Sequence, residues 1–290
     1  MVDEVLALFG DKMSTFLDCN LGVGGHAKAI LQNHPELALL IGIDKDQSAL
    51  KLAKQNLGAF EAKVKYVHGD FNALDQHLKI VGIKEVDGVL FDLGVSSMQL
   101  DEEKRGFSFR FNSPLDMRMD QTDPVCAKDI INTWTEKELG ELFKNGDVRN
   151  FQAIAKRIVQ SRKKQPILTT FDLIHCLEGL LIKTRKHNSA TLVFQALRLA
   201  VNKEVKHLQE ALPKALSMLK KGGICVVISF HSIEDRIVKN FIRENSAKQI
   251  EGEKLIPKVC NLTKKPLTPK EETKINKRAR SAKLRAFRKV

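Results

Sequence analysis

The sequence lacks several features that would mark particular classes of protein. Its five cysteines form no Cys-x-x-Cys pair and have no metal-like spacing with the eight histidines, which indicates reduced thiols and no metal site. No apolar run approaches the roughly 18 residues of a membrane span. Met1 leads into Asp3 and Glu4 rather than into a basic targeting segment. We therefore expect a cytoplasmic protein with no membrane partner.

What the chain has in excess is positive charge. The formal net charge is +13 and the pI is about 9.5, which points to a polyanionic partner, either nucleic acid or an anionic membrane surface. Residues 261–290 contain eleven Lys or Arg against two Glu, so they carry +9 of that charge. We expect the tail from Lys264 onward to be a partly extended arm that orders on RNA.

The segment Asp18–His26 has the character of a cofactor-binding turn, because apolar residues precede it and a helix-like segment follows. Glycine allows left-handed backbone dihedrals and lets a ligand approach main-chain N–H groups. Gly22, Gly24 and Ala27 also fit the dinucleotide pattern G-x-G-x-x-A, so the glycines do not distinguish NAD from another adenosine-bearing cofactor. Asp18, an acid at the end of the first strand, favours a cationic ligand such as S-adenosylmethionine.

Three more strand-like segments each lead into polar residues, where ligands bind in open α/β sheets. A continuous apolar run ends at Asp44, whose carboxylate suits the two hydroxyls of a ribose. The next strand leads into Asp70 and Phe71: either Asp70 accepts from an adenine amino group or Phe71 covers the ring, unless Phe71 is ordinary core. Residues 86–99 form the fourth strand and a polar loop, which we expect to face the transferred group.

From Leu100 onward the pattern changes to roughly eighty residues that read as helices without strands. Helices are expected over residues 135–143, 150–162, 170–184 and 194–216, and a strand from Ile224 resumes the sheet. The expected domains are therefore 1–100 and 206–290 for the sheet, with an inserted helical domain at 101–205.

Two features of the insertion bear on nucleic acid. A basic cluster either contacts phosphates or forms a solvated helix face. It comprises Arg157, Arg162, Lys163, Lys164, Lys183, Arg185 and Lys186. Trp134, the only tryptophan, either stacks on an extruded base or is a half-buried core residue, which is the commoner fate.

Long, unusual strings extend through the chain and are far more specific than a glycine loop. They are Gly22–His26, Asp92–Asp101, Arg105–Phe109, Pro114–Asp120, Phe194–Arg198, Ile228–Arg236 and Arg280–Arg285. On these strings the sequence closely resembles the bacterial 16S ribosomal RNA cytosine-N4 methyltransferases called MraW or RsmH.

The resemblance implies a Rossmann-like class I S-adenosylmethionine-dependent methyltransferase fold with an inserted helical substrate-recognition domain. It also implies S-adenosylmethionine as methyl donor and, as acceptor, a cytidine in the decoding centre of 16S rRNA in the small ribosomal subunit. Carried over by motif, the cofactor contacts are Gly24, Gly25, His26, Asp44, Phe71, Asp92 and Gln99. An acceptor for the proton of the cytosine amine is also needed, and Asp92, Ser96 and Asp116 are the candidates.

Other interpretations stay open at this point. The acceptor could be DNA or a protein amine. Departures from the family pattern at Asn188 and Leu192 also allow a non-catalytic RNA-binding assembly factor, and Lys277 replaces a usual proline. An NAD-linked dehydrogenase ranks last, because nothing after the fourth strand offers a hydride-transfer acid and base. The sequence leaves the oligomeric state open.

Overall fold

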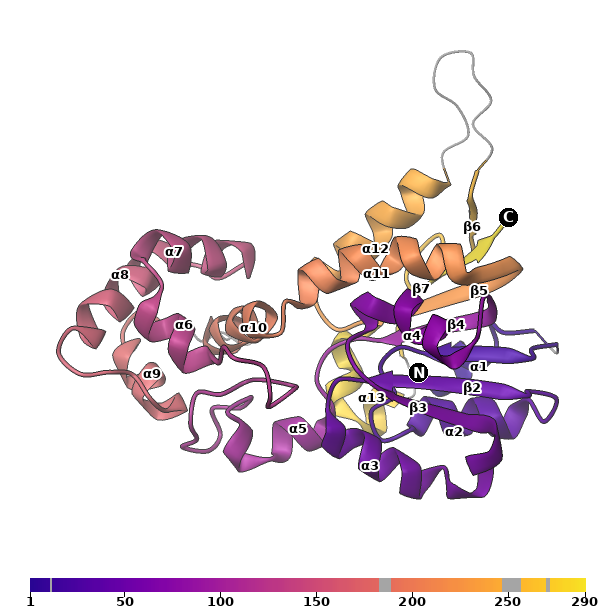
Figure 1. The fold of residues 1–290 in the computed structure, drawn as a ribbon. Coiled ribbons are helices and arrows are strands. Elements are labelled where there is room, and N and C mark those ends of the chain that lie inside the picture. The colour runs from indigo at the N-terminus through magenta and orange to yellow at the C-terminus, as the bar shows by residue number, and fades with distance from the viewer. Residues whose placement is uncertain (11, 183–188, 247–256, 270–271) are drawn as a thin grey trace, which may run out of the picture. The chain divides into compact units, whose positions relative to one another are not determined.

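A computed structural model describes residues 1–10, 12–182, 189–246, 257–269 and 272–290 (Figure 1). The chain divides into two compact units. The sheet unit comprises Met1–Gly94 and Lys206–Val290, and the helical unit comprises Val95–Val205. Within the described ranges, no helix combines the length and apolar character needed to cross a bilayer.

The sheet unit is built on seven strands in the order β3-β2-β1-β4-β5-β7-β6. Their bounds are β1 Thr15–Asp18, β2 Leu39–Asp44, β3 Val64–His68, β4 Val86–Asp92, β5 Leu219–Ser229, β6 Val259–Asn261 and β7 Lys283–Lys289. Strands β1 to β5 pair in parallel, whereas β7 runs antiparallel to both β5 and β6. The strand order reverses beside β1, where open α/β sheets bind their ligands.

Helices cover both faces of this sheet, which explains why its central strands read as continuous apolar runs. The helices are α1 Val2–Leu6, α2 Gly25–Asn33, α3 Gln47–Asn56, α4 Leu74–Val81, α11 Glu204–Met218, α12 Ser232–Asn245 and α13 Glu272–Ile275, with 3-10 turns η1 Gly58–Lys63, η2 Phe71–Ala73 and η4 Lys277–Ser281. One apolar cluster joins α4, α11 and α12 to the sheet, and the other joins α1, α2 and α3. Along β1, for example, Leu17 enters the first cluster and Phe16 the second.

The helical unit has its own apolar core, which includes the fully buried Leu139, Phe143, Ile154 and Ile158. Its helices are α5 Ser97–Asp101, α6 Ala127–Thr133, α7 Glu136–Asn145, α8 Phe151–Arg162, α9 Thr170–Cys176 and α10 Ser189–Val201, with the 3-10 turn η3 Glu103–Arg105. No strand is assigned in the described part of this unit, which follows from the helical periodicity of its sequence.

The C-terminal segment departs from the expected extended arm. Residues Lys283–Lys289 form β7 inside the sheet, where Leu284, Ala286 and Phe287 are fully buried. Arg285 is 8% exposed and pairs with Asp235 of α12, its Nε lying 2.7 Å from Oδ1. The prediction of an extended arm from the positive charge was therefore wrong for residues 283–289. They form a core strand, whose Arg285 is buried because the carboxylate of Asp235 compensates its charge.

Three expected elements have other bounds in the structure. Helix α9 ends at Cys176, well before residue 184. The helix expected over 194–216 is two helices, α10 and α11, because Lys203 adopts a left-handed φ of 53° between them. Strand β5 begins at Leu219, and the register with β4 shifts between Val86 and Gly88.

Candidate cofactor site

The glycine turn after β1 has the geometry that brings backbone N–H groups to a ligand. Gly22 and Gly24 have φ values of 54° and 86°, and Gly24 caps the N-terminus of α2. A Cβ at Gly24 would lie 3.0 Å from the side chain of Leu57, so a larger residue would be both strained and tightly packed. The first N–H groups of α2 have no partner within the helix and form a cradle for a negative group.

Four acids stand at the carboxyl edge of the parallel strands. Asp18, Asp44 and Asp92 end β1, β2 and β4, and Asp70 follows β3. Such a concentration of carboxylates beside a glycine turn suits a ligand with an ammonium, a sulfonium or several hydroxyls better than a pyrophosphate. This agrees with the reasoning from Asp18 in the sequence.

Asp18 is the most buried of these acids, with 1% of its surface exposed. Burial raises the pKa of its carboxyl to about 7, although the charge of His26 and the N–H of Asn20 act in the other direction. The backbone N–H of Asn20 donates to Asp18 Oδ1 at 3.2 Å. Asp18 is therefore a buried carboxyl beneath the loop rather than a group exposed at its surface.

Asp44 ties the glycine turn to the second strand. The N–H of Gly22 donates to its Oδ2 at 2.7 Å, and the N–H of Asp46 donates to its Oδ1 at 2.8 Å. Burial raises the pKa of Asp44 to about 6. The carboxylate of the neighbouring Asp46 caps the N-terminus of α3 by accepting a hydrogen bond from Ser48 N.

The third acid forms a pair with the histidine of the loop: His26 Nδ1 lies 3.1 Å from Asp92 Oδ2. Burial alone would lower the pKa of His26. The hydrogen bond and charge of Asp92, together with the charge of Asp18, instead raise it above its ordinary value.

Three buried polar atoms gather around the glycine turn with no hydrogen-bond partner among the described residues. They are Asn20 Oδ1, His26 Nε2 and Asp92 Oδ1. Since a buried polar atom is normally hydrogen-bonded, these atoms mark the place where a ligand completes the structure. Two of the three are acceptors, which fits a ligand bearing an ammonium. Asn20 was absent from the set expected from sequence, although it directly follows the strand-end Asp18-Cys19.

Asp70 and Phe71 lie in the loop after β3, and both are already in contact with protein groups. Asp70 Oδ2 lies 2.8 Å from His207 Nδ1 and 3.1 Å from Lys45 Nζ. The rings of Phe71 and Phe91 form a T-shaped pair with their centres 5.7 Å apart, and Phe71 is only partly buried.

The remaining candidates lie in the helical unit, where the structure gives them local partners. Ser96 and Gln99 form the capping box of α5: Gln99 N donates to Ser96 Oγ at 3.2 Å, and Ser96 N donates to Gln99 Oε1 at 3.0 Å. Asp116 binds the guanidinium of Arg118 with both oxygens, at 2.9 and 2.7 Å. Although burial acts to raise it, the pKa of Asp116 is lowered by this pairing, which makes its carboxylate a weak base.

The residues considered for RNA contact have different surroundings. Trp134 ends α6 and packs, partly buried, against the core of the helical unit. Arg162 donates to the carbonyl of Ile131 at 2.6 Å, whereas Arg157, Lys163 and Lys164 are exposed. Lys183, Arg185, Lys186 and Asn188 lie outside the described residues.

A parallel sheet with the strand order 3-2-1-4-5-7-6, an antiparallel β7 and a glycine turn after β1 defines a class I methyltransferase, the class whose methyl donor is S-adenosylmethionine. The chain belongs to the MraW methylase family, whose sequence profile matches residues 1–290. The expected family, fold class and cofactor are thereby confirmed.

Three similar proteins carry the name ribosomal RNA small subunit methyltransferase H. The one from Hydrogenobaculum sp. (strain Y04AAS1) is 48% identical, over 93% of this chain and 87% of its own. That from Caldicellulosiruptor saccharolyticus is 42% identical, over 95% and 92%. That from Persephonella marina is 42% identical, over 99% and 97%.

Proposed function

We propose that this methyltransferase transfers a methyl group from S-adenosylmethionine to the N4 amine of a cytidine in the decoding centre of 16S rRNA, in the small ribosomal subunit. The names of its relatives support an rRNA substrate. The cytosine-N4 acceptor is inferred from the sequence strings shared with the MraW/RsmH family. A ribosomal substrate also implies a cytoplasmic enzyme.

The observation that carries the cofactor site is the group of unpartnered polar atoms around the glycine turn. Asn20 Oδ1 would accept from the ammonium of the methionine end, Asp92 would lie beside that end, and the N–H groups of Gly25 and His26 would receive its carboxylate. Asp44 would hold the ribose hydroxyls, since each of its oxygens retains a lone pair beyond its one backbone donor. Phe71 would cover the adenine, and Gln99 stays a predicted contact.

S-adenosylmethionine supplies a methyl group on a sulfonium, whose thioether leaving group is neutral, so no leaving-group acid is needed. The protein must orient the amine and accept a proton from it. Of the three candidate acceptors, Ser96 caps a helix and Asp116 is paired with Arg118. Asp92 retains an unpartnered oxygen, so we assign the proton acceptor to Asp92 Oδ1.

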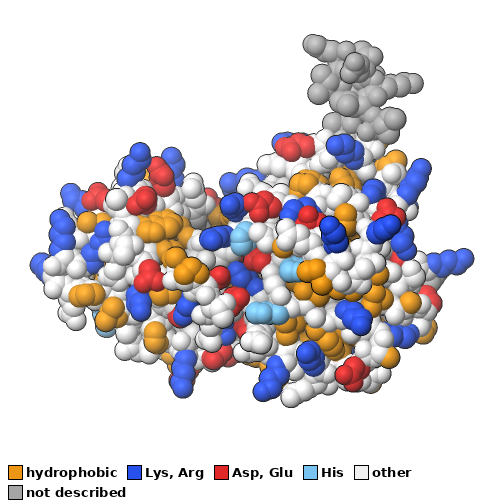
Figure 2. Space-filling view, viewed as in Figure 1, with side chains coloured by type: hydrophobic (Ala, Val, Ile, Leu, Met, Phe, Trp, Pro, Cys, Tyr) orange, Lys and Arg blue, Asp and Glu red, His pale blue; other side chains and the backbone are white. Residues whose placement is uncertain are grey.

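The exposed face of α8 and the two lysines that directly follow it are the candidate contact for RNA phosphates. Residues 148–171 contain six Lys or Arg and no Asp or Glu. Lys156, Arg157, Lys163 and Lys164 are exposed, and none forms an ion pair with an acid of the described residues. Figure 2 shows blue side chains at the left edge of the helical unit, in the region where Figure 1 labels α8. Basic side chains that bind phosphates displace the counterions condensed on the RNA, which favours association.

The test is methyl transfer from labelled S-adenosylmethionine to small subunits from a strain lacking the enzyme, followed by nuclease digestion and nucleoside analysis. We expect label in N4-methylcytidine, its loss in Asp92→Asn, and its retention in Ser96→Ala. Label in another nucleoside, in DNA or in protein would refute the proposal that cytosine N4 is the methyl acceptor. Cofactor binding without any transfer would support the assembly-factor alternative.

A further inference from the structure

A polar cluster grips the loop after β3 from several sides. Asp70 Oδ2 lies 2.8 Å from Nδ1 of His207 and 3.1 Å from Nζ of Lys45, while the N–H of Asn72 donates to Asp70 Oδ1 at 3.0 Å. On the other side, Nε2 of His77 lies 3.1 Å from the backbone oxygen of Asp70. Both the side chain and the main chain of Asp70 are therefore fixed.

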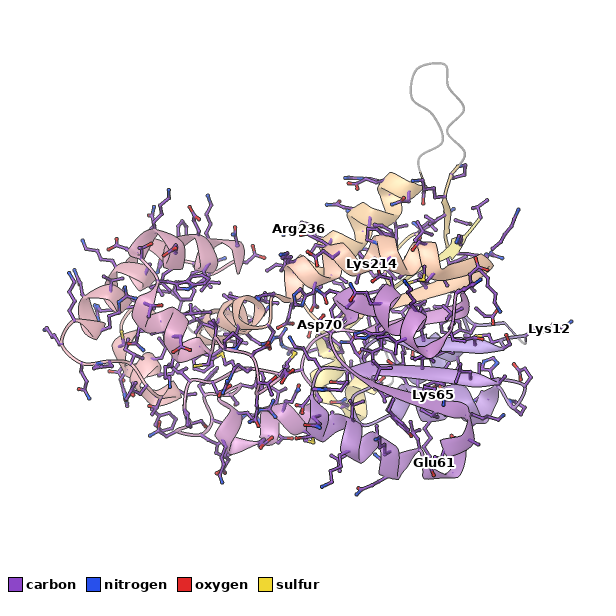
Figure 3. The ribbon with its side chains drawn as sticks, viewed as in Figure 1. Lys12, Glu61, Lys65, Asp70, Lys214 and Arg236 are labelled. Carbon is purple, nitrogen blue, oxygen red and sulfur yellow. The ribbon has the colours of Figure 1, made fainter. Side chains whose placement is uncertain are left out.

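Asn72, which follows Phe71, is held by residues of α11, the helix that also carries His207. Lys214 Nζ donates to the backbone oxygen of Asn72 at 2.6 Å, and Asn72 Nδ2 donates to Glu210 Oε2 at 3.3 Å. Figure 3 labels Lys214 and Asp70. His207, Glu210 and Lys214 follow one another at spacings of three and four along α11, so they share one face of that helix. Helix α11 thus holds both neighbours of Phe71.

The pairs in this cluster are well shielded from solvent. The side chains of Asp70, His207 and Lys45 expose 17%, 13% and 15% of their surface. Although burial acts to raise it, the pKa of Asp70 is lowered by His207 and Lys45, so its carboxylate stays charged. Charge-assisted hydrogen bonds in such surroundings are stronger and more directional than those between exposed groups.

We infer that His207 is a positioning residue for the cofactor: through Asp70 it fixes the loop that presents Phe71 to the adenine. This inference rests on the proposed cofactor site. It also favours one of the two interpretations of the loop, because three donors hold the carboxylate of Asp70 and leave a single lone pair on Oδ1. Adenine is then recognised by the ring of Phe71, and Asp70 acts on the protein rather than on the adenine amino group.

The first experiment uses His207 variants that differ in where they place an N–H donor. Asparagine places its amide nitrogen near the position of Nδ1, glutamine places it near Nε2, and leucine has no donor. We expect the Kd for S-adenosylhomocysteine, measured by calorimetry, to rise about tenfold in His207→Leu and His207→Gln and to stay within about twofold in His207→Asn.

A matched control is available in the same unit. His34 is another buried histidine beside a carboxylate, with its Nδ1 2.9 Å from Glu36 Oε1. It lies at the opposite end of α2 from the glycine turn. His34→Leu is expected to leave the Kd unchanged, even where it lowers the Tm. Equal losses of affinity in His34→Leu and His207→Leu would mean that His207 acts only through overall stability.

The second experiment separates ring coverage from recognition of the amino group. S-inosylhomocysteine has an oxygen where adenine has its amino group. If Phe71 recognises the ring, Asp70→Asn weakens binding of both ligands by the same factor. If Asp70 accepts from the amino group, only binding of S-adenosylhomocysteine weakens, and the inference is wrong.

A third measurement asks whether His207 works through Phe71. We expect the effects of His207→Leu and Phe71→Leu on Kd to be strongly non-additive, because His207 has no ring to position once Phe71 is replaced. Additive losses would refute the inference. Failure of the wild-type protein to bind S-adenosylhomocysteine would instead refute the proposed cofactor site.

Discussion

Asp18→Asn is expected to make the fold more stable at neutral and alkaline pH. In the folded protein burial raises the pKa of Asp18 to about 7, compared with 3.8 for an ordinary aspartate. The folded state therefore binds this proton more tightly than the unfolded state. As pH rises from about 4 to 7, the unfolded state loses the proton first, and the free energy of unfolding falls by about 1.4 kcal/mol per pH unit.

The full cost is reached above pH 7, where both states are ionised. A difference of about three pKa units corresponds to about 4 kcal/mol, and the complete burial of Asp18 leaves little solvent screening to reduce it. Asparagine keeps an oxygen for the N–H of Asn20 but carries no charge. The variant should therefore avoid this cost.

The assay is urea unfolding of both proteins between pH 5 and pH 9. The difference in unfolding free energy should grow with pH up to about 7 and then level off, and subtraction of the two curves removes all other titrating groups. A difference that does not change with pH would refute the argument from burial. Above pH 7, where Asp18 is ionised, the same variant should also bind S-adenosylmethionine more weakly, because it lacks this negative charge beneath the loop.

Three further predictions concern other parts of the chain. Asp235→Ala should lower the free energy of unfolding, measured with urea, by about 3–5 kcal/mol, because it leaves Arg285 buried without its partner. Glu178→Ala is the control: it removes an exposed pair with His175 and should cost less than about 0.5 kcal/mol. Gly24→Ala should cost about 1–2 kcal/mol and weaken cofactor binding in calorimetry, because φ is 86° there; the helical Gly140→Ala, whose Cβ meets nothing within 4 Å, should not be destabilising. The pair Lys163→Gln and Lys164→Gln should reduce the slope of log Kd for single-stranded rRNA against log salt by about 1.4. An unchanged slope, or an equal change in Lys79→Gln with Lys84→Gln, would exclude these two lysines as phosphate contacts.

Local sequence signals were sufficient for the parallel half of the sheet. Glycines mark the turn after β1, and apolar runs ending in acids mark β2 and β4 with the correct bounds within a few residues. Strand β7 was missed because four of its seven residues are Lys or Arg, and the residue that neutralises Arg285 lies 50 positions away in the chain. Likewise, nothing near Asp70 in the sequence indicates His207, which is 137 positions away.

The state of the predicted acids also depended on the tertiary structure. Spacing alone placed Asp44 and Asp92 at the strand ends, but it did not distinguish Asp92, with an unpartnered oxygen, from Asp116, with both oxygens on Arg118. The break between α10 and α11 has a similar cause. The amphipathic pattern runs through Lys203, whose left-handed φ interrupts the helix without any glycine to mark it.

The order of the strands has a consequence for synthesis on the ribosome. The helical unit is continuous in the chain, so it can fold as soon as Val205 has emerged. The sheet unit must wait for β5 and then for β7. Until β5 has emerged, β4 presents an apolar, unpaired edge, and β5 presents the unpaired edge until β7 has emerged. A nascent chain stalled after Val205 and before β7 is therefore the form of this protein most in need of a chaperone.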